Sequence, residues 1–517
     1  MKKEKGFTLI ELLAVIVILA VIALIASPLI INIIESSRKK AFENSVYGVM
    51  STYDIKISKE GNYKGITYNF PEGNSELLYS GTKMIGGSIF LTPPGSIEVR
   101  RITDGRYCAS GNKTNLVIKR GDCTIDLAVA PVLKGAQGLT VNFLNTGIAK
   151  TTIESIEVIM VSEFPESAID VSDKGNSGVM LWSKDENSNG MLEVYIGAID
   201  DFVYANPNSS NLFSNMDNIY NMNLSNFDTI TATNMNSMFY QTGFNTLNFT
   251  LDLGNNFDTS NVTNMDNMFS FVGGNSTKLI LNLGDKFDTS NVINMNYMFS
   301  SVGLFSTNFT LDLGNKFNTS NVTNMNGMFS SMGVNSTSFT LDLGDKFDTS
   351  NVTNMNIMFY NTGRFSTNSV LILGNEFDTS KVEDMNSMFG GVGHNSTNFI
   401  LELGNKFDTS NVTNMDNMFS FVGGNSTKLI LNLGDKFDTS RVTSMNGLFS
   451  RVGQNASNFV LNLGAKFNVD NITDGTFIFY LTGSANPSFK PTASVKTQAE
   501  KDALLSKFPN IEVTIVP

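Results

Sequence analysis

The chain has few of the residues from which most catalytic and metal-binding sites are built. Its 517 residues include only one histidine, two cysteines and one tryptophan. A single histidine cannot supply a metal-ligand set or a catalytic triad. No paired carboxylates and no nucleophile with a neighbouring base stand apart from the repeated pattern described below. We therefore expect no enzyme activity, no cofactor and no metal ion.

Positive charge is scarce as well. The formal net charge is −12, and no long basic run lies beyond the N-terminus. A protein that binds nucleic acid needs a basic patch or stripe to neutralise phosphates. We therefore do not expect nucleic acid as a partner, and an acidic surface mainly favours solubility.

The N-terminus carries a long apolar run. Three lysines and Gly6 precede apolar residues that continue from Phe7 to Ile34. As a helix this run is about 42 Å long, which is enough to cross a bilayer. An ordinary signal peptide has a shorter apolar core followed by a small-residue cleavage site. Glu11 interrupts the run, and because a lone carboxylate in lipid is costly without a partner, Glu11 is a candidate functional residue.

The stretch KGFTLIEL, followed by this apolar run, resembles the type IV prepilin signal, which pseudopilins of secretion and competence machines share. The resemblance implies that a prepilin peptidase cleaves between Gly6 and Phe7 and methylates the new amino terminus at Phe7. It also implies that Glu11 pairs with the amino group of a neighbouring pilin subunit, which gives the carboxylate an opposite charge. Two alternatives stay open: a pseudopilin of a type II secretion or competence-type machine, and a membrane-anchored surface protein that never assembles.

Short alternating runs such as SIFLT, SIEVRRI and LVIKR follow between residues 59 and 130. They predict a small antiparallel sheet packed on the N-terminal helix, as in a pilin head. The only cysteines, Cys108 and Cys123, bracket a hairpin in this segment. In an exported protein we expect them to form a disulfide that adds about 3 kcal/mol of stability. In a reducing compartment they would be two unpaired thiols.

A second β-rich segment follows at residues 131–220. Its turn DENSNG, from Asp185 to Gly190, matches the first half of a calcium-binding loop. Ile196 stands where such a loop needs a bidentate glutamate. We interpret this stretch as a hairpin turn.

From residue 221 the chain repeats with a period of 30 residues. One phenylalanine ladder consists of Phe227, Phe257, Phe287, Phe317, Phe347, Phe377, Phe407, Phe437 and Phe467. A second ladder consists of Phe239, Phe269, Phe299, Phe329, Phe359, Phe389, Phe419, Phe449 and Phe479. A single unit cannot bury its own apolar face, so such repetition predicts a stacked solenoid.

Each unit predicts a strand, a turn, a short helical segment and a return loop. Phe249 and Leu251 alternate with polar residues, which is the period of a half-buried strand. Val262, Met265 and Met268 recur at helical spacing, which places one apolar face toward the strand.

The copies differ little from one another. Residues 257–290 and 407–440 are identical at all 34 positions, which indicates recent copying within the array. His394 lies where other copies carry other residues, and we interpret it as drift between repeats.

The recurring line FDTSNVTNMNxMF closely resembles the BspA-like leucine-rich repeats of bacterial surface proteins. The resemblance covers most of residues 150–517. It implies an extracellular module for adhesion or protein interaction, although the loop rich in Gly, Ser and Asn is longer than in the common unit.

The outward row of the stacked strands is a candidate ligand-binding face, because its side chains repeat at fixed spacing on a rigid scaffold. The row consists of Asp252, Asn282, Asp312, Asp342, Glu402, Asn432 and Asn462. It suits a host or surface protein, or a glycan. The alternative is a merely solvated sheet face.

Together these patterns predict an α+β multidomain chain. The expected parts are a leader (1–6), a transmembrane assembly helix (7–58), a β head (59–130), a β-rich segment that caps the array (131–220), a strand/short-helix solenoid like a leucine-rich repeat (221–485) and a C-terminal cap (486–517). We expect a membrane-anchored precursor that becomes part of a pilus or the cell surface, with its ectodomain outside. The large ectodomain favours a minor or tip pilin over a major subunit.

Overall fold

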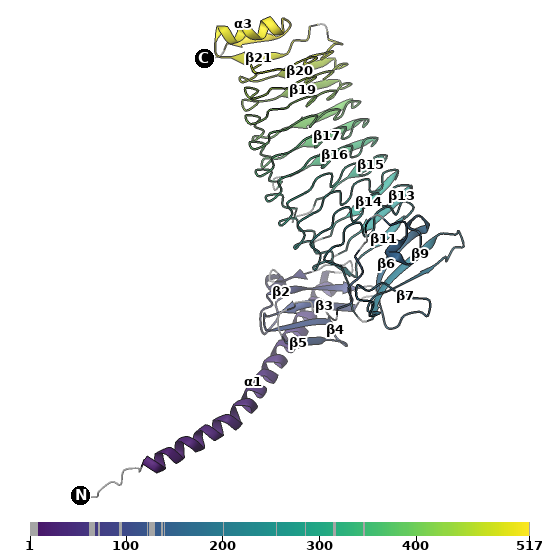
Figure 1. The fold of residues 1–517 in the computed structure, drawn as a ribbon, viewed down its shortest axis with the longest axis vertical. Coiled ribbons are helices and arrows are strands. Elements are labelled where there is room, and N and C mark those ends of the chain that lie inside the picture. The colour runs from purple at the N-terminus through teal and green to yellow at the C-terminus, as the bar shows by residue number, and fades with distance from the viewer. Residues whose placement is uncertain are drawn as a thin grey trace, which may run out of the picture. The chain divides into compact units, whose positions relative to one another are not determined.

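The computed structural model describes residues 9–60, 68–70, 73–92, 96–120, 123, 130–135, 138, 140–199, 201–254, 256–284, 286–313, 317–344, 347–486 and 488–515. Side chains before residue 34 lie outside this description. The chain divides into two compact units, Met1–Ala128 and Val129–Pro517, which we call the head unit and the repeat unit (Figure 1). The finer boundaries within each unit stay predictions.

The head unit is built on one long helix, α1 (Leu9–Glu60). In its C-terminal part Phe42, Val46, Val49 and Tyr53 are buried at the three- and four-residue spacing of one helix face. The predicted membrane-spanning run at 7–34 lies almost wholly among residues whose side chains are not described. Within the part of the chain that was searched, no helix is both long and apolar enough to span a membrane.

A five-stranded antiparallel sheet completes the head unit, as the alternating runs predict. Its strands are β1 (Tyr68–Asn69), β2 (Gly86–Thr92), β3 (Ser96–Thr103), β4 (Tyr107–Asn112) and β5 (Val117–Arg120), paired in chain order, with the short helix α2 (Gly73–Glu76) between the first two. Ile89, Val99 and Ile102 face the buried side of α1 in one apolar cluster. This cluster is the only source of core packing for the described part of the unit.

The repeat unit begins with a mixed β segment. It contains the short 3₁₀ turns η1 (Phe143–Asn145) and η2 (Lys150–Thr152) and the strands β6 (Ile153–Val161), β7 (Ile169–Asp170), β8 (Met180–Lys184) and β9 (Leu192–Ile199). β6 pairs in parallel with the first strand of the repeats, β11 (Asn221–Asn223), and β10 (Val203–Tyr204) pairs with β12 (Phe227–Asp228). The segment therefore covers the N-terminal end of the stacked core.

Each 30-residue coil then contributes one parallel strand. The strands are β13 (Asn248–Asp252), β14 (Lys278–Asn282), β15 (Asn308–Thr310), β16 (Ser338–Asp342), β17 (Asn368–Ile372), β18 (Asn398–Glu402), β19 (Lys428–Asn432) and β20 (Asn458–Asn462). Each strand residue pairs with the residue 30 positions later in the next coil, so that Phe339 lies opposite Ser369 and Ser369 lies opposite Phe399. Figure 1 shows the coils following one another in chain order within this unit. We call residues 221–485 the coil array.

The stacked core accounts for both phenylalanine ladders. The rings of Phe239, Phe269 and Phe299 are nearly parallel, with centroids 5.5 and 5.4 Å apart. Met265 and Met268 are fully buried beside them. At the C-terminal end β21 (Thr492–Val495), α3 (Gln498–Lys507) and β22 (Glu512–Ile515) continue the sheet, and a capping box of Thr497 and Glu500 begins α3.

The predicted short helix in each coil is wrong. Among the described residues of the coil array the segment between strands is a series of turns, with left-handed φ values at Asn267 (54°), Phe271 (62°) and Gly273 (55°). Left-handed residues cannot continue a right-handed helix. Alternate N–H groups bond within and between coils: Met268 donates to the Met265 carbonyl at 3.1 Å, whereas Phe269 donates to the Met298 carbonyl of the next coil at 2.9 Å.

Candidate functional site

The predicted processing and assembly residues fall at the edge of what the structure describes. Gly6 and Phe7 lie outside the described residues, and Glu11 lies in α1 with its side chain outside them. Cleavage after Gly6, methylation at Phe7 and pairing of Glu11 with a neighbouring subunit therefore stay predictions.

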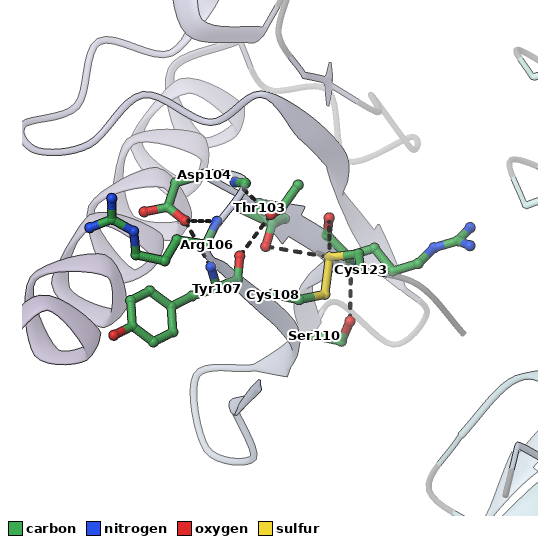
Figure 2. Close-up of a disulfide and its surroundings, with 10 residues drawn as sticks. Thr103, Asp104, Arg106, Tyr107, Cys108, Ser110 and Cys123 are labelled. Carbon is green, nitrogen blue, oxygen red and sulfur yellow. Dashed lines mark hydrogen bonds between the residues drawn. A yellow bond between two sulfur atoms is a disulfide. The ribbon is translucent and has the colours of Figure 1, made fainter. Parts of the chain in front are cut away.

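The structure contains the predicted disulfide between Cys108 and Cys123, whose Cα atoms are 5.1 Å apart (Figure 2). Cys108 lies in β4, just after the turn that joins β3 to β4. In that turn the N–H groups of Arg106 and Tyr107 donate to Asp104 Oδ1 at 2.9 Å, and the Thr103 hydroxyl donates to the Tyr107 carbonyl at 2.7 Å. The disulfide thus links the segment after β5 to β4, and the hydrogen bonds of the preceding turn hold the start of β4 in place.

The predicted ligand-binding row lies on the outward side of the coil array. Six of its members occupy the last position of their strands, Asp312 lies just beyond β15, the coil of β17 has Ile372 instead, and all seven members are at least partly exposed. Most of them also have a structural contact. The N–H groups of Gly254, Gly344 and Gly464 donate to the side-chain oxygens of Asp252, Asp342 and Asn462 at 2.9 to 3.0 Å.

These contacts are turns in which an Asp or Asn side chain caps the backbone two residues later, and they end the strand. Local structure is therefore a sufficient reason for Asp and Asn at this position. Glu402 is different, because among the described residues its carboxylate has no such bond. The row is solvent-facing, but most of its polar groups are already used by the fold.

A cluster that the sequence analysis missed lies on the turn side of the coil array. The Phe421 ring lies beneath two guanidinium groups, with the Arg364 Cζ 5.9 Å and the Arg451 Cζ 5.3 Å from its centroid. His394 meets the same ring edge to face at 5.2 Å, and its Nδ1 lies 3.1 Å from the Phe421 carbonyl. Tyr480 extends the cluster, with its ring centroid 5.8 Å from the Arg451 Cζ.

We call Arg364, His394, Phe421, Arg451 and Tyr480 the cationic corner. Burial lowers the pKa of His394, and the two neighbouring guanidinium groups lower it further, against the opposing effect of its hydrogen bond to the Phe421 carbonyl. The spacing of these residues, close to multiples of 30, was the signal in the sequence that could have found them. Because the five residues are of different types, no recurring residue marked them in the sequence.

The array and the N-terminus each match a known family model. Residues 1–27 match the prokaryotic N-terminal methylation motif. Residues 207–276, 270–401 and 394–503 match the model described as Mycoplasma protein of unknown function, DUF285, and together cover more than half of the chain. The chain belongs to the DUF285 family.

The DUF285 matches cover the coil array and its C-terminal end, and the methylation motif covers the start of α1. Both resemblances noted in the sequence are therefore confirmed. Comparisons with curated proteins and with solved structures found no match.

The two families indicate a type IV pilin-like surface protein that carries a DUF285 repeat domain. The methylation motif implies processing by a prepilin peptidase and assembly with other pilins. Both families are structural rather than enzymatic.

Proposed function

We propose that this chain is a minor or tip subunit of a type IV pilus-like filament and that its coil array is an adhesin. The observation that carries the proposal is the prepilin methylation motif on the same chain as the DUF285 array. The motif supports assembly through α1. The array forms a separate compact unit with its own continuous core, so it does not need the filament to fold.

The size of the repeat unit supports a minor or tip position. Val129–Pro517 is by far the larger of the two units, and every copy in a filament would have to accommodate it. A filament made mainly of smaller pilins with a few copies of this chain avoids that crowding.

Immunogold labelling of intact cells tests the proposal. We expect label on fibres, sparse or at their ends, in cells that produce the wild-type chain. Glu11→Gln removes the carboxylate from the apolar run and should move the label from fibres to the envelope. Glu43→Gln, a matched change further along α1, should leave the fibres labelled.

Label spread evenly over the envelope with the wild-type chain would contradict assembly and support the membrane-anchored alternative. Dense label along the whole length of every fibre would contradict a minor or tip position. Release of cargo or uptake of DNA that depends on the chain, without labelled fibres, would support a pseudopilin.

The outward strand row stays a candidate surface for a protein or glycan ligand. Glu402→Gln tests it most cleanly, because most of the other members also cap their strand ends. If the row binds the ligand, cells with this variant adhere less well at an unchanged level of surface label. Asp342→Asn tests a second member of the row, since asparagine keeps the bond from the Gly344 N–H, and unchanged adhesion in both variants would exclude the row.

A further inference from the structure

The corner of each coil contains a left-handed backbone conformation, which in most coils is occupied by a residue that does not favour it. Nine residues at successive coils have φ between 55° and 76°. They are Gln241, Phe271, Ser301, Ser331, Asn361, Gly391, Phe421, Arg451 and Leu481. Glycine and asparagine adopt this conformation at least cost, and other residues adopt it only with steric strain.

Only Asn361 and Gly391 in this row are the residues that the backbone prefers. Gly391 shows that a coil folds with glycine there, so the fold does not require Phe421 or Arg451. Strained positions that persist in a structure are concentrated at functional sites.

Variation between coils is not confined to this row, since a second left-handed row that runs from Ser237 to Phe477 varies as well. Three residues after the strained row, the side chains are again different in almost every coil: Phe244, Gly274, Leu304, Val334, Arg364, His394, Gly424, Gln454 and Ser484. Exposure does not explain this, since most residues of this corner row are half-buried or buried, whereas a row that is exposed in every coil is threonine in all coils but two. That row is Thr233, Thr263, Ile293, Thr323, Thr353, Glu383, Thr413, Thr443 and Thr473.

The threonine row has a structural role that explains its uniformity. The hydroxyls of Thr413 and Thr443 donate to the carbonyl of the preceding coil at 3.2 Å. Among the described residues no side-chain bond of this kind recurs along the corner rows, and most residues of the strained row depart from what the backbone prefers. Their identities are therefore best explained by what they contact outside the coil array.

The cationic corner is the part of this surface with the most definite chemistry. Arg364, His394 and Arg451 gather around one ring in a chain whose net charge is −12. Among the described residues no carboxylate forms an ion pair with either guanidinium group. The Arg364 Nε is buried without a hydrogen-bond partner among those residues.

Exposed rings and amides border these bases. Phe365 is 47% exposed and Tyr480 46% exposed, and each ring also has a guanidinium group over it, that of Arg364 at 5.4 Å and that of Arg451 at 5.8 Å. Asn395, Asn425 and Asn455 form a ladder beside them, with Nδ2 to Oδ1 distances of 2.8 and 2.6 Å. Aromatic faces pack against the C–H side of a sugar ring, amides bond its hydroxyls, and arginine binds a carboxylate through two parallel bonds.

We propose that the cationic corner binds an acidic glycan, a saccharide chain that bears carboxylate groups. Arg364 and Arg451 would hold the carboxylates, and Phe365 and Tyr480 would pack against the sugar rings. The inference rests on the proposed adhesin function and names its ligand class and surface.

The chain provides a matched control. Phe271 and Phe421 occupy the same position in the two identical stretches 257–290 and 407–440. Around Phe271, however, the neighbours are the rings of Tyr240 and Phe244, at 5.9 and 6.2 Å, instead of three bases. The two sites therefore differ only in what adjacent coils supply.

The test measures binding of the detergent-solubilised full chain to polygalacturonate. The methyl ester of polygalacturonate, which lacks the charge, and poly-glutamate, which lacks the sugar rings, are the comparison ligands. We expect binding to polygalacturonate and at least tenfold weaker binding to both comparison ligands. Arg451→Gly should weaken binding at least tenfold without lowering the melting temperature, because glycine relieves the left-handed conformation. Phe421→Ala should weaken binding several-fold, and Phe271→Ala should not.

Several outcomes would overturn the inference. Equal binding of poly-glutamate would assign the corner to acidic peptides, and equal binding of the methyl ester would remove the role of charge. An equal loss in Phe271→Ala and Phe421→Ala, or unchanged binding in Arg451→Gly, would exclude the cationic corner. Labelled fibres with no binding of polygalacturonate would overturn the ligand class alone and leave the filament assignment intact.

Discussion

The head unit and the repeat unit are stabilised in different ways. In the head unit one helix and one five-stranded sheet share a single apolar cluster, and one disulfide closes the sheet. The coil array has no cysteine, and each coil packs only on its neighbours in a core that runs through the whole array. Damage in the head unit should therefore affect all of it at once, whereas damage in the array should spread from coil to coil.

Substitution of a central stacked ring should have the largest effect. Phe329 is fully buried, with ring centroids 5.9 Å from Phe299 and 5.7 Å from Phe359. Phe329→Ala should lower the free energy of unfolding of the array by about 3–5 kcal/mol, because it removes buried area and leaves a cavity. Calorimetry should show the array transition shifted down or split, with the transition of the head unit unchanged.

Phe365→Ala is the matched control, since this ring is nearly half exposed and should cost far less. A fall in both transitions with Phe329→Ala would show that the two units do not unfold independently.

Loss of the disulfide should have the next largest effect, confined to the head unit. The link joins residues 15 apart, and opening a loop of that length costs about 3 kcal/mol. Cys108→Ser should therefore lower only the melting temperature of the head unit. A reducing agent should do the same to the wild-type chain and nothing further to the variant; a shift of the array transition would contradict the separation.

The sequence predicted the fold correctly wherever the spacing of its apolar residues is compatible with only one kind of secondary structure. Alternation at Phe249 and Leu251 predicted a strand, and two cysteines allowed only one pairing within the chain. The spacing of Val262, Met265 and Met268 was ambiguous, because a helix and a stack of turns bury the same positions. What decides between them is the bond from Phe269 to the next coil, which no single repeat reveals.

The cationic corner was hidden for a related reason. Arg364, His394, Phe421 and Arg451 come from four successive coils, and only stacking brings them together. Within a single copy of the repeat, each of these residues looks like random variation between repeats. The strand row was easier to find because its residues are similar, yet that similarity follows from the turns that end the strands.

A third change tests whether polar bonds between coils add to the stacked core. Thr379 is fully buried, and its hydroxyl donates to the Asp408 carbonyl and accepts from the Asp408 N–H, both at 2.7 Å. Thr379→Val keeps the shape but leaves both groups unsatisfied, which should cost about 1–3 kcal/mol. Thr379→Ser keeps the hydroxyl and should recover most of the loss in urea unfolding. Equal loss in both variants would assign the effect to packing of the methyl group instead.

The effects of pH should be small for each pH unit, and they should have opposite signs in the two units. Lys150 lies buried in η2 at the start of the repeat unit, where its Nζ donates to the Ser214 carbonyl at 2.8 Å. Burial lowers the pKa of Lys150 from 10.5 to about 8. Between these values the unfolded chain keeps a proton that the folded chain has lost, so stability should rise with pH by at most about 1.4 kcal/mol per pH unit.

Tyr53 in the head unit should act in the other direction. Burial, with a smaller effect of Tyr68, raises the pKa of Tyr53 above its ordinary value of 10.0. Above pH 10 the unfolded chain loses a proton that the folded chain keeps, so the head unit should become less stable as pH rises. Urea unfolding of each unit between pH 8 and 11 should show the two opposite slopes. Lys150→Met should abolish the rise in the repeat unit, and Tyr53→Phe should reduce the fall in the head unit; an unchanged slope in either variant would assign it to other groups.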